Sequence, residues 1–88
     1  MLNALVISAS LATCQPISEF AKELMDARQA GVPLAQALTV ARHNATMEAL
    51  IVSAYRKPRY STEDYRERAA VEFANATLVT CLDAGEEE

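Results

Sequence analysis

Two cysteines and one histidine are the residues of this chain with the widest chemistry. Cys14 and Cys81 can form a disulfide, attack a substrate or bind a metal, and His43 can act as a base or a ligand. A zinc site draws its ligands in pairs about three to five residues apart, which holds them on one turn. Here the three residues are 29 and 38 positions apart and none is paired. We therefore expect no metal, no cofactor and no catalytic residue, and we place His43 at the C-terminal end of a short helix.

A basic and aromatic cluster lies in the middle of the chain and consists of Arg56, Lys57, Arg59 and Tyr60. Arginine and tyrosine can hold nucleic acid by reaching phosphates and stacking on bases. Carboxylates follow directly at residues 63–67, however, and they neutralise this neighbourhood. Tyrosine and arginine also dominate the binding energy of protein interfaces. The cluster is therefore predicted to be a protein-binding corner, and no nucleic acid is expected.

The composition supports one small folded domain. The chain has 88 residues, of which 51% are hydrophobic and 23% charged, and a formal net charge of −4. This is too apolar for a disordered chain and too acidic for non-specific phosphate binding. Three of the acids form the terminal run 86–88, and we expect the chain to be frayed from Gly85 onward. The predicted domain covers residues 13–85.

The N-terminal segment, residues 1–12, has no charged side chain, and the first charge in the chain is Glu19. It is far shorter than the roughly 20 residues that a spanning helix needs, so no stable membrane span is expected. Its length suits the apolar region of a signal peptide, with small residues at positions 10 and 12 for cleavage before Thr13. A signal peptide normally begins with basic residues, which are missing here. The segment is therefore either a signal peptide or an N-terminal apolar helix of the domain.

Helical spacing of apolar residues continues through the rest of the chain, and almost nothing indicates a strand. Pro16 suits a first helical position, Gly31 a helix end, Asn44 or Thr46 a cap, and Pro58 requires the helix before it to end near residue 56. We predict an all-α fold, a small bundle of four helical segments at 17–30, 34–42, 45–56 and 62–82. The expected buried positions include Ile17, Phe20, Ala21, Leu24, Ala27, Leu34, Leu38, Ala41, Met47, Leu50, Ile51, Ala54, Tyr55, Tyr65, Ala69, Glu72 or Phe73, Ala76, Leu78 and Val79.

The two cysteines lie at opposite ends of this predicted domain, Cys14 before its first helix and Cys81 in the last turn of its final one. In four antiparallel segments the start of the first and the end of the last lie together. A Cys14–Cys81 disulfide is therefore geometrically reasonable. Such a bond persists in an oxidising compartment, which agrees with an exported protein, periplasmic or secreted; a cytoplasmic protein would keep both thiols reduced.

The sequence resembles a family of small uncharacterised exported proteins with two cysteines and a helical domain, encoded by tailed phages, prophages and proteobacteria. The matching features are the two cysteines, Ala27–Leu34 with its Arg-Gln-x-Gly turn, Ile51–Ser61 with its Tyr-x-x-Pro-Arg corner, and Phe73. The resemblance implies export and a disulfide and no particular activity. In size and two-cysteine helical plan alone, the chain is also similar to periplasmic acid-stress chaperones of the HdeA type.

These observations favour a non-enzymatic protein-binding module whose partner is another protein. We expect an exported phage or bacterial factor that acts as an inhibitor, as an immunity protein or on the cell envelope. One alternative is a periplasmic chaperone-like protein that exposes its apolar stripes when its carboxylates are protonated in acid. Another alternative is a cytoplasmic phage effector that binds a host protein, with residues 1–12 as part of its core.

Overall fold

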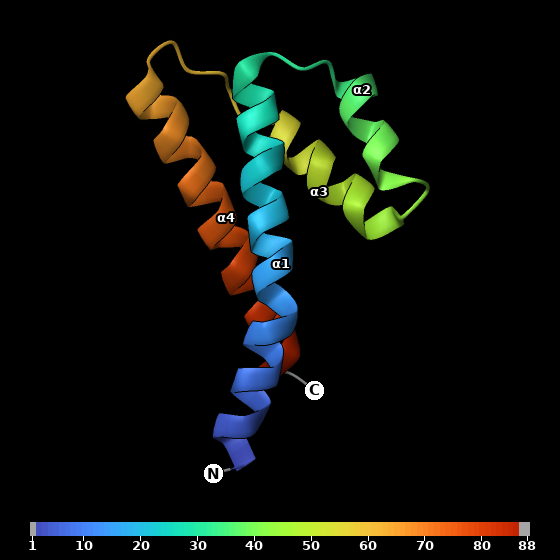
Figure 1. The fold of residues 1–88 in the computed structure, drawn as a ribbon, viewed down its shortest axis with the longest axis vertical. Coiled ribbons are helices and arrows are strands. Elements are labelled where there is room, and N and C mark those ends of the chain that lie inside the picture. The colour runs from blue at the N-terminus through green and yellow to red at the C-terminus, as the bar shows by residue number, and fades with distance from the viewer. Residues whose placement is uncertain (1, 87–88) are drawn as a thin grey trace.

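The computed structural model describes residues 2–86, which form helices and no strand. Figure 1 shows α1, α2, α3 and α4 running in alternating directions, with α4 on one side of α1 and α2 and α3 on the other. The all-α bundle of four helical segments predicted from the sequence is confirmed. The helices are α1 (Leu2–Ala30), α2 (Leu34–Leu38), α3 (Ala45–Tyr55) and α4 (Glu63–Glu86), and a 3₁₀ helix (Thr39–Ala41) extends α2.

Local sequence signals set two of the helix ends. Gly31 has φ = +90°, the left-handed conformation of a C-terminal glycine. The N–H of Val32 then donates to the Ala27 carbonyl at 3.0 Å, and the N–H of Gly31 to the Arg28 carbonyl at 3.1 Å, which together form a Schellman motif. At the start of α3, the Asn44 side chain accepts from the N–H of Met47 at 3.0 Å. The predicted helix end at Gly31 and the predicted cap at Asn44 are both present.

The start of α1 differs from the prediction, because the helix runs through Pro16 instead of beginning there. Proline has no N–H, so Pro16 cannot donate to the Ala12 carbonyl and one bond of the helix is missing. Ala12 is exposed, so water can satisfy that carbonyl. Burial of Cys14 against α4 favours helix on the N-terminal side of the proline. The residues before Pro16 therefore extend α1 and do not form a separate helix.

The last helix, α4, is longer than predicted and continues through Gly85 to Glu86. The expectation that the chain is frayed from Gly85 onward is therefore wrong at Gly85 and Glu86. Two residues of the predicted acidic tail, 87 and 88, lie outside the described residues.

The hydrophobic core lies where α1 meets the other helices, and alanine is its commonest residue. Alanines from all four helices take part, and the larger buried side chains are Leu24, Met25, Ile51 and Phe73. Most predicted positions are buried or half-buried, but Ile17, Leu34, Tyr65, Ala76 and Val79 are exposed. On α4 the buried positions are 70, 73 and 74, so the face that meets α1 is rotated from the predicted one.

Both α3 and α4 pack against α1, and no comparable packing joins them to each other. The fold is thin, with principal extents of 46, 31 and 16 Å. Its radius of gyration is 14.2 Å, whereas a compact domain of this length has about 12 Å. Among the described helices, none combines the length and apolarity that crossing a membrane requires.

Candidate functional site

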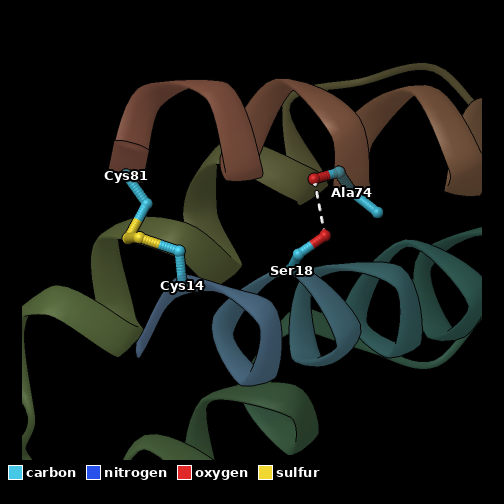
Figure 2. Close-up of a disulfide and its surroundings, with 4 residues drawn as sticks. All are labelled: Cys14, Ser18, Ala74 and Cys81. Atoms are coloured by element: carbon cyan, nitrogen blue, oxygen red, sulfur yellow. Dashed lines mark hydrogen bonds between the residues drawn. A yellow bond between two sulfur atoms is a disulfide. The ribbon is translucent and has the colours of Figure 1, made fainter. Parts of the chain in front are cut away.

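The disulfide predicted from the sequence is present and joins α1 to α4. Cys14 and Cys81 are bonded, with their Cα atoms 5.7 Å apart, which is an ordinary separation for such a pair. One turn along α1, the Ser18 hydroxyl donates to the Ala74 carbonyl at 2.9 Å (Figure 2). The pairing of α1 with the C-terminal half of α4 is therefore fixed by one covalent bond and one hydrogen bond.

The two motifs that carry the family resemblance meet at the opposite end of α1. The Arg59 guanidinium donates to the Gln29 carbonyl at 3.3 and 3.4 Å, at the C-terminus of α1. The Arg28 side chain donates in turn to the Lys57 carbonyl at 3.0 Å. The Tyr55 hydroxyl donates to the Val32 carbonyl at 2.7 Å. The Arg-Gln-x-Gly turn and the Tyr-x-x-Pro-Arg corner thus form one hydrogen-bonded unit.

Gln29 is the centre of this unit and is the one buried polar residue described, with 2% of its surface exposed. Its amide donates to the Pro58 carbonyl at 2.8 Å, and its carbonyl oxygen accepts from the N–H of Tyr60 at 2.8 Å. A single side chain therefore satisfies two backbone groups of the connection between α3 and α4. Gln29 was not predicted from the sequence. Its position four and eight residues after the buried Met25 and Ala21 places it on the same face of α1 and was the available signal.

The predicted protein-binding corner divides into residues with different surroundings. Arg59 holds the end of α1, as described above, which gives its guanidinium a structural partner. Arg56 is exposed, and its side chain forms no hydrogen bond or ion pair with the described residues. Lys57 and Tyr60 line an apolar groove between α3 and α4. The corner as a contact surface for another protein remains a prediction.

Replacing Gly31 with alanine tests this unit. We expect Gly31→Ala to lower the free energy of unfolding by about 1–2 kcal/mol, because φ = +90° is unfavourable for an L-residue. The added Cβ would also lie 3.1 Å from Nη2 of Arg59, so the guanidinium would have to move. Urea denaturation measures the loss of unfolding free energy. The control is the reverse exchange, Ala30→Gly, at the preceding helical position, which is exposed. A Gly31→Ala protein as stable as the wild type would contradict this account.

A large, mainly apolar groove lies between α3 and α4, with α1 as its floor. Its volume is about 770 Å³. The floor includes Ile17 and Met25, and Leu50 and Phe73 are the larger side chains of the walls. The remaining wall positions are mostly small: Thr46, Ala49 and Ser53 on α3, and Ala69, Ala76, Thr77, Thr80 and Ala84 on α4. We call this feature the α3–α4 groove.

Two charged side chains line the α3–α4 groove, Lys57 from the end of α3 and Glu72 from α4. Neither forms an ion pair within the described part of the chain. The sequence analysis did not predict the groove, because the spacing of small residues along one helix does not show that a second helix diverges from it. Thr46, Ala49 and Ser53, which lie three and four residues apart, are the sequence signal that was available.

A second, polar cleft lies between α1 and α4 and is lined mainly by acids, among them Asp26, Glu63, Asp64 and Glu67. The Lys22 ammonium bridges the two helices, 3.2 Å from Asp26 and 3.5 Å from Glu67. Its hydrogen bond to Asp26 is the main cause of the raised pKa of Lys22. A raised pKa extends the range in which Lys22 is charged, so its charge is kept throughout the neutral range.

His43 lies in the turn that follows the 3₁₀ helix, where its φ is +69° and its side chain is exposed. Within the described residues, no three His, Cys, Asp or Glu side chains are grouped so that they could hold a metal ion.

Comparison of the chain with known protein families, with curated proteins and with solved structures finds no match. The resemblance to the exported two-cysteine family therefore remains a prediction.

Proposed function

We propose that this protein is a non-enzymatic binding module that works in an oxidising compartment, and that the α3–α4 groove is its docking surface for protein. The groove is the observation that carries the proposal. It is open and lined mainly by apolar groups, and apolar grooves of this kind are where amphipathic helices of partner proteins dock. Small side chains on both walls leave room for a helix, since packed helices approach to about 8–10 Å.

The disulfide supports the proposed oxidising compartment. Structural disulfides persist outside the reducing cytosol, so the Cys14–Cys81 bond is compatible with a periplasmic or secreted protein. A small binding module in such a place fits the roles of an inhibitor, an immunity protein or an envelope-interaction factor of a phage or bacterium. The apolar, uncharged segment 1–12 agrees with export as a cleaved signal.

Site-specific photocrosslinking in the cells that produce the protein tests both parts. A photoreactive amino acid is placed at Ser53 or at Ala76, on opposite walls of the groove, and at Asn75 as the control on α4 outside it. We expect discrete protein adducts from both groove positions and none from the control. We also expect the adducts in the exported fraction, with a mature N-terminus near Thr13.

Two results would count against the proposal. Adducts that form equally from Asn75 and from the groove positions would show that the groove has no special role in docking. A protein that stays in the cytoplasm with residues 1–12 attached would reject export, whatever it binds.

A further inference from the structure

We infer that the Cys14–Cys81 disulfide is a redox switch for the α3–α4 groove. A dithiol reductant reaches the bond at Cys81, and reduction releases the C-terminal part of α4, residues 75–86, which forms much of one groove wall. The inference rests on the proposed function where it concerns docking, because it describes how the same groove is regulated. The release of the helix end does not depend on that function.

Packing of apolar side chains is sparse at the end of the α1–α4 pair that the disulfide joins (Figure 2). The last buried residue described on α4 is Ala74, and the first one on α1 after Cys14 is Ala21. Among the side chains described at this end, residues 11–20 and 75–84, Cys14 alone is buried. The disulfide therefore lies where the rest of the helix pair has a hydrophobic core.

The two helix ends are also weak helices by themselves. Residues 75–86 of α4 make about three turns, and a helix of that length is marginal in water without tertiary packing. Thr77, Val79 and Thr80 are branched at Cβ, which lowers helix propensity. On α1, Pro16 removes one hydrogen bond of the helix. We therefore expect both ends to fray once the two sulfurs are separated.

The released part of α4 carries much of the groove. The groove-lining residues of α4 that lie beyond its last buried position are Ala76, Thr77, Thr80, Cys81 and Ala84. On the floor of the groove, Ile17 lies about one turn after Cys14 on α1. The core side chains Ile51 and Phe73 lie outside the frayed segments. Reduction should therefore remove one end of the groove and leave the rest of the domain folded.

The two sulfurs differ in access, which gives the reduction a direction. Cys14 has 2% of its surface exposed, whereas Cys81 is half-buried and lines the groove. A thiolate of the reductant therefore attacks Sγ of Cys81, because thiol–disulfide exchange requires access to the sulfur. The Sγ–Sγ bond breaks, and its electron pair leaves on Cys14, which takes up a proton. The second thiolate of the reductant then attacks the mixed disulfide, so that Cys81 leaves, takes up a proton and the reductant ends as a disulfide.

Amide hydrogen exchange measured by NMR tests the release of the helix end. In the oxidised chain we expect protection along α4. After reduction with dithiothreitol, the amides of residues 78–84 should exchange close to the rate of an unstructured peptide, and those of residues 70–74 at least about 10-fold more slowly. The control is a reduced chain whose two sulfurs are rejoined through one methylene group, which dithiothreitol does not cleave. It should keep the protection of the oxidised chain.

A brief pulse of a monothiol tests the direction of attack. The oxidised chain is treated with glutathione, the released thiol is blocked with iodoacetamide, and the peptides are identified by mass spectrometry. Glutathione should be found on Cys81 in at least about 10-fold excess over Cys14, which should carry the iodoacetamide label. Equal amounts of glutathione on the two cysteines would overturn the direction of attack.

Photocrosslinking in the producing cells separates this inference from the proposed function. With the photoreactive amino acid at Ala76, the Cys14→Ser/Cys81→Ser variant should give several-fold fewer adducts per molecule than the disulfide-bonded chain. Equal yields overturn the control of docking. If residues 78–84 stay protected after reduction, or if the whole chain loses protection together, the switch is overturned, while adducts of the oxidised chain still support the proposed function. An oxidised chain without groove adducts contradicts the proposed function and, with it, the control of docking.

Discussion

The Cys14→Ser/Cys81→Ser double variant will lose about 4 kcal/mol of unfolding free energy relative to the oxidised wild type. The bond joins residues 67 positions apart, and closing a loop of that length restricts the unfolded chain by about this amount. Small domains have only about 5–15 kcal/mol of stability in total. The core of this one is thin and rich in alanine, so the variant will have little stability left. Urea denaturation followed by circular dichroism measures the difference.

Reduced wild-type protein is the matched control, because it loses the same bond without a change of sequence. It should unfold at the same urea concentration as the double variant. A loss below about 1 kcal/mol in both samples would mean that packing of α1 against α4 holds the domain without the disulfide. Thr80→Ser is a second control, at the exposed residue next to Cys81 on α4. It should leave stability unchanged, which would show that a substitution to serine at this end of α4 is not destabilising by itself.

The second large effect is expected at Gln29. Gln29→Ala will lower the unfolding free energy by about 2–3 kcal/mol, because the Pro58 carbonyl and the Tyr60 N–H both lose their partner. The side chain is 2% exposed, so water does not simply replace the amide. The connection between α3 and α4 should loosen as well. The near-ultraviolet circular dichroism of Tyr60, whose ring centroid lies 6.1 Å from that of Tyr65, should then weaken.

Gln36→Ala is the control for this prediction, since Gln36 is exposed on α2 and makes no side-chain hydrogen bond. Gln29→Glu separates the two bonds of Gln29. It keeps the acceptor for Tyr60 but places a carboxylate oxygen against the Pro58 carbonyl. This variant should be unstable at neutral pH and partly recover in acid, where a protonated carboxyl can donate. Equal stability of the Gln29→Ala and Gln36→Ala variants would show that the Gln29 side chain does not stabilise the connection between α3 and α4.

Features that depend on a few neighbouring residues were predictable from the sequence. The end of α1 depends on the backbone freedom of Gly31, and the start of α3 on the side chain of Asn44. Both effects act within one turn of the helix, so no knowledge of the fold is needed. The disulfide followed from one further step, the assumption that the segments are antiparallel.

Features that depend on how helices pack could not be predicted in the same way. The apolar residues of α4 surround most of the helix, so spacing alone did not decide whether Val79 or Ala74 faces α1. Pro16 is compatible with a helix start and with an exposed helix interior, and only the contact of Cys14 with α4 selects the second. The α3–α4 groove arises because two helices share a neighbour and diverge, which is a property of the assembled fold.

The Cys14–Cys81 bond also makes a covalent ring of everything between the two cysteines, including α2, α3 and the exposed connection at residues 56–62. A protease that cuts that connection once would open the ring and release no fragment. The two pieces would stay joined through sulfur, with α1 still held to α4. In an oxidising solution, a nicked molecule would thus keep its helix pair until the bond itself was reduced.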